Sequence, residues 1–207
     1  MKTLRIILPV LLAIVFSCCN QQPKNQKAET LDSLKTSIEN ELLAHAKYWE
    51  YANMARKDSL LEIAAMFHAT AVAEKAHVDR QITVLLSHGG MLGQFKPDFA
   101  PYNLRENLKK AIEVEYYEAM EMYPAFITIS EKDGFADATE SFGWALQAEM
   151  KHWDIFKQAL ASLDDPGIKL PKAYMVCPRC GNTMDAEDYS SPCDICQNEA
   201  SKFVKVD

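Results

Sequence analysis

Two pairs of side chains with the spacing Glu-x-x-His could each supply two ligands to a metal ion. They are Glu74 with His77 and Glu149 with His152. A step of three residues in a helix places both side chains on one face. Each pair also interrupts an apolar series of helical spacing, so it points into a core, where an unpaired charge costs roughly several kcal/mol. Core charges of this kind are tolerated when they are paired or bind metal.

Three further glutamates interrupt two other apolar series in the same way: Glu41, Glu115 and Glu118. All seven side chains fall near the midpoints of predicted helices, and the midpoints of packed helices of similar length lie at one height. Five carboxylates at one height could not stay ionised without cations. One Glu from each of two helices, with Glu-x-x-His from the other two, is the pattern of di-iron and di-manganese carboxylate sites. The mixture of oxygen and nitrogen ligands favours iron or manganese over calcium or structural zinc.

The elements that must position these ligands are four amphipathic helices, which predict a mainly α protein with a four-helix bundle. The first helix ends near Lys57, the second stops at Gly89 and Gly90, the third begins after Pro101 and the fourth begins near Gly134. Residues 89–101 could span about 43–47 Å, close to the length of about 45 Å of a 30-residue helix. The second and third helices can therefore run parallel, as in ferritin-like folds with a long crossover.

Local signals predict details of two helices. Asp58 or Ser59 is expected to cap the second helix. Pro124 is expected to kink the third helix, whose buried series should continue through Met122 to Ala125.

Four cysteines predict a second metal site near the C-terminal end: Cys177, Cys180, Cys193 and Cys196. Two Cys-x-x-Cys knuckles can place four thiolates tetrahedrally around one metal and staple a segment too short to have its own core. The spacing does not choose between iron and zinc. Two disulfides are the alternative in an oxidising compartment, but adjacent knuckles at this spacing favour the metal.

The start of the chain has the features of an export signal. A basic start leads into an apolar run that ends at Phe16 and is shorter than the roughly 20 residues of a membrane span. The sequence before Cys18 resembles a bacterial lipoprotein cleavage box, which predicts lipid modification of Cys18, with Cys19 as the second choice, and a lipid-anchored protein of the cell envelope. A plain signal peptide or an uncleaved anchor is the alternative. The net charge of −7 argues against a nucleic-acid partner.

Together these features divide the chain into five parts. They are a signal peptide (1–17), a polar tether (18–30), the bundle (31–165), a linker (166–173) and a four-cysteine domain (174–207).

From about Leu31 to Asp207 the sequence resembles the rubrerythrin family. The matching residues are Leu34, Glu41, Ala44, Tyr48, Phe67, Thr70, Glu74, His77, Asn107, Leu108, Glu115, Glu118, Met122, Tyr123, Pro124, Ala148, Glu149 and His152, with the C-terminal knuckles as a rubredoxin-like domain. The resemblance implies a non-haem di-iron peroxidase that reduces hydrogen peroxide to water. It also implies a single iron at the four cysteines, which passes electrons to the iron pair across a head-to-tail homodimer; the electron donor is unknown.

The resemblance further implies individual roles. Glu74 and Glu149 would bridge the irons, Glu41 and Glu118 would bind one iron, and Glu115 with His152 the other. His77 would replace Glu118 upon reduction. Tyr48 and Tyr123, on seams near the site, are either core aromatics or donors to a bound oxygen species. The alternatives are a ferroxidase, and an iron-sequestering protein with a structural zinc ribbon.

Overall fold

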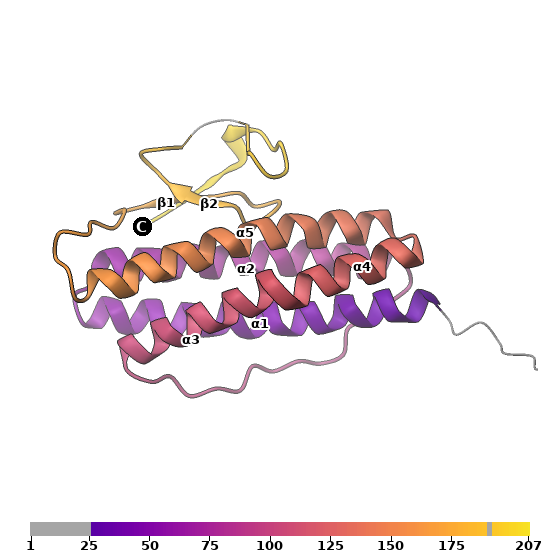
Figure 1. Cartoon of the computed structure of the whole chain (residues 1–207), viewed down its shortest axis with the longest axis horizontal. Coiled ribbons are helices and arrows are strands. Elements are labelled where there is room, and N and C mark those ends of the chain that lie inside the picture. Colours follow the sequence, from indigo (N-terminus) through magenta and orange to yellow (C-terminus); the bar gives the residue numbers. More distant parts are fainter. Residues whose placement is uncertain (1–25, 190–191) are drawn as a thin grey trace, which may run out of the picture.

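The computed structural model describes residues 26–189 and 192–207, which form helices and one small sheet (Figure 1). The helices are α1 (Gln26–Lys57), α2 (Leu61–Ser87), α3 (Leu104–Tyr117), α4 (Tyr123–Asp133) and α5 (Ala136–Ser162). A π-helical segment, η1 (Glu118–Met122), joins α3 to α4, so these three elements form one continuous rod. With α1, α2 and α5 this rod makes the predicted four-helix bundle, which is confirmed.

The connections between helices also follow the prediction. Short turns join α1 to α2 and α4 to α5, so each pair is antiparallel (Figure 1). Residues 88–103 run along the outside of the bundle from the end of α2 to the start of α3. Because this crossover returns to the end at which α2 began, α2 and α3 run parallel.

The C-terminal segment forms a three-stranded antiparallel sheet against the bundle. Its strands are β1 (Tyr174–Val176), β2 (Thr183–Asp185) and β3 (Val204–Val206), in the order β2-β1-β3, and a short 3-10 helix, η2 (Ala200–Lys202), precedes β3. Tyr174, Val176 and Val206 are buried in the same apolar cluster as Phe67 of α2 and Phe156 of α5. The sheet therefore completes its core with side chains of the bundle.

Two apolar clusters fill the bundle and leave a polar layer between them. One includes Tyr48 and Phe156, and the other includes Ile38 and Phe142. Along α1, Glu41 lies between buried residues of the two clusters. On each of the other three rods the candidate ligands likewise lie between residues of one cluster and residues of the other. The candidate ligands thus occupy a single layer in the middle of the bundle.

The third rod departs from the prediction in its second half. The Tyr123 N–H bonds to the Glu118 carbonyl, five residues back, which widens this turn into a π-helix just before Pro124. The extra residue shifts the buried series, so that Tyr123 is buried and Ala125 is exposed. The prediction of a buried Ala125 was wrong for this reason, and the irregularity comes before Pro124, which lies in the first turn of α4.

Two predicted helix boundaries were also wrong. α1 begins at Gln26, inside the predicted polar tether. α2 begins after Leu60, which makes no side-chain cap, while Ser59 has a φ of 61° and forms part of the turn. The backbone N–H groups of Asp58, Ser59 and Leu60 bond back to carbonyls of α1, so these residues close α1 and do not cap α2.

Within the part of the chain that the structure describes, no helix is both long and apolar enough to cross a membrane. The predicted signal peptide, Cys18 and Cys19 lie outside the described residues.

Candidate metal centres

Two sets of buried ligands lie next to each other in the polar layer. The first contains Glu41, Glu74, His77 and Glu149, and the second contains Glu74, Glu115, Glu149 and His152. In each set the ligand atoms lie within 4.8 Å of one another. Two metal ions could therefore be held side by side.

Glu74 and Glu149 belong to both sets because each carboxylate turns one oxygen toward each histidine. Glu149 Oε1 lies 2.9 Å from His77 Nδ1, and its Oε2 lies 2.7 Å from His152 Nδ1. Glu74 Oε2 lies 3.0 Å from His77 Nδ1, and its Oε1 lies 3.4 Å from His152 Nδ1. This is the arrangement that bridging carboxylates require.

The two histidines are oriented by the first cysteine knuckle. His77 Nε2 lies 3.0 Å from the Cys180 carbonyl oxygen, and His152 Nε2 lies 3.3 Å from the Gly181 carbonyl oxygen. A carbonyl can only accept, so each Nε2 donates its proton and each Nδ1 can present a lone pair to a metal ion held by the carboxylates. A hydrogen bond of this kind on the outer nitrogen is the usual support of a metal-bound imidazole.

Glu118 lies in the same layer but outside both sets. Its side chain is buried at the start of η1, and its Oε2 has no hydrogen-bond partner within the described residues. The structure therefore places His77, and not Glu118, among the ligands of the first set.

Unpaired polar atoms show that these residues fit a metal pair. Buried atoms without a hydrogen-bond partner within residues 26–189 and 192–207 include Glu41 Oε2, both oxygens of Glu74, His77 Nδ1, Glu115 Oε2 and Glu149 Oε1. A buried polar atom is normally hydrogen-bonded, and leaving it unpaired costs about 1–3 kcal/mol. Since these atoms converge on the layer shared by the two sets, bound cations are the partners that satisfy them.

Two tyrosines hold the outer carboxylates. The Tyr48 hydroxyl donates to Glu115 Oε1, and the Tyr123 hydroxyl donates to Glu41 Oε1. The Tyr123 oxygen in turn accepts from Gln81 at 3.0 Å. Both hydroxyls thus contact ligands directly, and burial, followed by the nearby glutamates, raises the pKa of each.

Burial and mutual repulsion divide the glutamates of the layer into two kinds. Burial, with the neighbouring carboxylates, raises the pKa of Glu41, Glu115 and Glu118 well above the usual range. Burial also acts to raise the pKa of Glu149, but the charges and hydrogen bonds of His77 and His152 together lower it. The pKa values of the two carboxylates shared by both ligand sets, Glu74 and Glu149, are therefore lowered, whereas those of the outer carboxylates are raised.

The four cysteines form a separate, buried cluster. Sγ atoms of Cys177 and Cys196 lie 3.6 Å apart, as do those of Cys180 and Cys193. A disulfide has an S–S distance of about 2.05 Å, and the structure describes all four thiols as free, so the disulfide alternative is wrong. Thiolates about 2.3 Å from one tetrahedral metal would be separated by close to the observed distance.

Sequence reasoning missed the residues that complete the knuckles. Asn182 and Asn198 each follow the second cysteine of a knuckle by two residues, and their amides donate to Cys193 Sγ at 3.4 Å and Cys177 Sγ at 3.6 Å. The repeated pattern Cys-x-x-Cys-x-Asn was a visible signal for this role. Gly181 was missed too: it has a φ of +73°, and a Cβ there would lie 2.2 Å from His77 Nε2.

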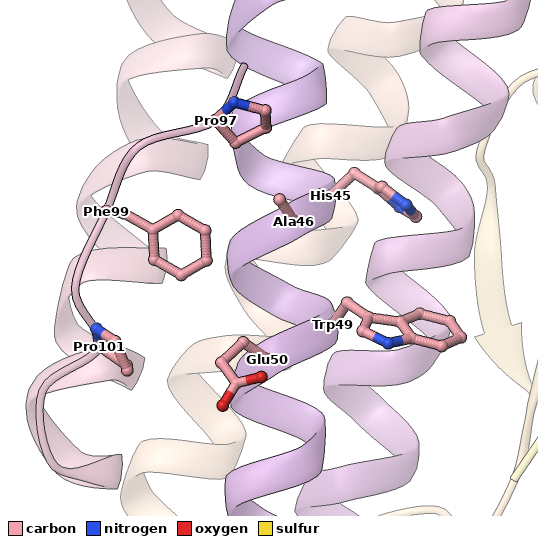
Figure 2. A pocket seen from close by; sticks show the side chains of 7 residues that line it. All are labelled: His45, Ala46, Trp49, Glu50, Pro97, Phe99 and Pro101. Atoms are coloured by element: carbon pink, nitrogen blue, oxygen red, sulfur yellow. The ribbon is translucent and has the colours of Figure 1, made fainter.

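A surface pocket of about 610 Å³ lies away from the metal layer, between α1 and the crossover (Figure 2). His45, one turn after Glu41, lines it together with Trp49 and Phe99. The His45 Nδ1 hydrogen-bonds to the Ala71 carbonyl at 2.7 Å, so this side chain ties α1 to α2.

Comparison with known proteins assigns this architecture to a family. Residues 32–160 match the sequence model of the rubrerythrin family. The chain belongs to this family. Nigerythrin of Nitratidesulfovibrio vulgaris is 34% identical over 184 residues, covering 87% of this chain and 88% of that protein. Rubrerythrin-2 of Clostridium acetobutylicum is 30% identical, covering 86% of this chain and 97% of that protein.

Solved structures agree with the assignment. The fully reduced, all-ferrous state of nigerythrin matches with a TM-score of 0.77 and 32% identity, over 85% of this chain and 86% of that one. A bacterioferritin of Mycobacterium tuberculosis, at 19% identity and a TM-score of 0.62, shares the fold alone. The carboxylate and histidine layer of this rubrerythrin-family chain is therefore a di-iron site, and the four cysteines form a second metal site.

Replacing Gly181 by alanine is expected to separate the knuckle from the di-iron histidines. The added Cβ would clash with His77 Nε2, and a left-handed φ costs a non-glycine residue about 1–2 kcal/mol. We expect both sites to bind metal, while electron transfer between them, the role proposed below for this contact, slows at least tenfold, as measured by rapid-mixing absorption. Gly143→Ala is the control, because a Cβ there meets nothing within 4 Å; equal rates in both variants would contradict the assigned role.

Metal-free protein is expected to lose stability as pH rises above 4.5, the ordinary pKa of a glutamate. Glu41 and Glu115 have raised pKa values, so the stability gained by protonation is present at low pH and is lost as pH rises through those values. His77 and His152, whose pKa values the carboxylates also raise against the effect of burial, act in the same direction. The lowered pKa of Glu149 matters only at more acidic pH.

Bound iron takes the place of these protons, so the iron-loaded protein should keep its stability as pH rises. Melting temperatures of metal-free and iron-loaded protein at several pH values test this. The difference between them should widen with pH, and a constant difference would show that the layer does not hold these protons.

Proposed function

We propose that this rubrerythrin-family protein reduces hydrogen peroxide to water at the di-iron site, using electrons that arrive through the four-cysteine site. The observation that carries the proposal is the direct contact of the Cys180 carbonyl with His77, a ligand of the di-iron layer. A peroxidase needs such a connection to be recharged. A ferroxidase, or a protein that only stores iron, has no use for it.

The reaction consumes two electrons and two protons per peroxide and releases two waters. When bound, two ferrous ions would supply both electrons for cleavage of the O–O bond, and the four-cysteine iron would replace them one at a time. Glu74 and Glu149 are proposed to bridge the pair, because each presents one oxygen to each ligand set.

Other residues of the chain orient the outer ligands. Tyr48 and Tyr123 keep Glu115 and Glu41 turned toward the metals through their hydroxyl protons. His77 and Glu118 are proposed to exchange as ligands between redox states. The described geometry, with His77 in the ligand set and Glu118 Oε2 unpartnered beside it, supports the reduced arrangement.

Rapid mixing of anaerobically reduced protein with stoichiometric hydrogen peroxide tests the activity. We expect the visible absorption of a ferric four-cysteine site to appear as peroxide disappears. Cys180→Ser should abolish this signal and reduce peroxidase turnover at least 100-fold, while the di-iron site stays loaded. Unchanged turnover in that variant would mean that the four-cysteine site is structural, and a colourless site would indicate zinc.

The path of the electrons in an assembly can be tested by complementation. In the described chain Cys180 contacts His77 of the same chain, and this supports a relay within each chain. A mixture of His77→Ala and Cys180→Ser chains, refolded together, should then remain inactive. The head-to-tail homodimer is a second proposal with the opposite result. An intact Cys180 would serve the intact His77 of its partner, so every mixed dimer, about half of all dimers, would regain one active site.

We further propose that a lipid on Cys18 anchors the protein in the cell envelope. The lipoprotein-like sequence before this cysteine supports the proposal. Mass spectrometry of the intact protein from membranes should find a chain that begins at Cys18 and carries lipid. A chain that retains Met1, or begins after Cys19, would contradict it.

A further inference from the structure

A groove of about 400 Å³ lies where the cysteine knuckles meet α2. Arg80 lines it from α2, and Pro178 and Arg179 line it from the first knuckle. Asn198, after the second knuckle, and Lys202, on η2, complete its wall. Both knuckles therefore border the groove.

The groove carries positive charge on a protein whose net charge is −7. Its one carboxylate, Asp79, is paired with Lys75, and Arg80 is paired with Glu140 at 3.0 Å. Arg179 and Lys202 are exposed, and neither has a carboxylate partner among residues 26–189 and 192–207. Two cations thus remain free to attract an anionic surface.

An aromatic side chain holds part of this charge in place. The guanidinium carbons of Arg179 and Arg80 lie 4.6 Å and 5.2 Å from the centre of the Trp144 ring. Trp144 itself packs against the cluster that contains the four cysteines. Cation–π contacts of this kind limit the freedom of an arginine, so the positive surface is fixed next to the thiolates before any partner binds.

The first knuckle connects this groove with the di-iron site. The Cys180 carbonyl contacts His77, while Pro178 and Arg179 of the same knuckle line the groove. Asn198, also in the groove wall, donates to Cys177 Sγ at 3.6 Å. A carrier bound in the groove would therefore contact residues that lie next to the cysteines in sequence or donate to their sulfurs.

We propose that the groove is the docking surface for an acidic one-electron carrier protein. The inference rests on the proposed function, because it names the class of donor that the four-cysteine site requires. In each encounter the carrier is oxidised by one electron and the four-cysteine iron is reduced from ferric to ferrous. Charge complementarity of this kind mainly raises the association rate and makes it sensitive to salt.

Binding is tested with the full chain and oxidised flavodoxin, an acidic one-electron carrier, as the probe. Surface plasmon resonance should show binding that weakens as ionic strength rises. Arg179→Glu and Lys202→Glu should each raise the Kd about tenfold at low salt. Lys202→Glu guards against a folding defect, since this exposed residue is not one of the two cations that lie over the Trp144 ring.

Lys96→Glu is the matched control for charge. Lys96 is an exposed residue of the crossover. The crossover runs along the other side of the bundle from the sheet (Figure 1), so this variant should bind as the unaltered protein does. Binding that is insensitive to salt, or equally weakened in all three variants, would overturn the docking assignment.

Electron transfer separates failure of this inference from failure of the proposed function. Reduced methyl viologen, a small cation, should reduce the four-cysteine iron equally fast in all variants, whereas reduced flavodoxin should be slowed by Arg179→Glu and Lys202→Glu. If neither donor reduces the site in the unaltered protein, the proposed relay is wrong. The binding data alone then show whether the groove is a docking surface. Equal flavodoxin rates in all variants would reject the groove as the entry point.

Discussion

The confinement of five carboxylates to one buried layer is the constraint on which the rest of the structure depends. Glu74 and Glu149 lie at its centre, and Glu41, Glu115 and Glu118 surround them. Their repulsion in a low-dielectric core would oppose folding without cations. The bundle isolates this layer between two apolar clusters, and each of the four helical rods must place its ligands at the same height.

The cysteine knuckle adds a second constraint, because the same short peptide serves both metal centres. Cys180 supplies one thiol to the four-cysteine cluster and one carbonyl to His77. The adjacent Gly181 carbonyl faces His152. This sharing explains why the small sheet uses bundle side chains for its core: the knuckle must be held within hydrogen-bond distance of two ligands on different helices.

Regular spacing made most of the metal layer predictable from sequence. Glu-x-x-His pairs and apolar series fix the face of a helix, and the length of residues 89–101 limits the topology. The contact between His77 and Cys180 could not be predicted in this way, because these residues are 103 positions apart and no helical period relates them. Ala125 was misplaced because one extra residue in a helix leaves no mark on local composition.

That extra residue has a consequence for how the family can vary in sequence. η1 accommodates one residue more than an α-helix would need between Glu118 and Tyr123. If the same residues formed a regular α-helix, α4 would be rotated by about 100° relative to α3, and the Tyr123 hydroxyl would turn away from Glu41. Loss of one residue from η1 would leave Tyr123 facing Glu41 only if the turn became α-helical at the same time. Loss or gain of a residue elsewhere between Glu115 and Tyr123 would turn α4 away. The chemistry of the site thus fixes the match between the number of residues in this turn and the type of helix they form.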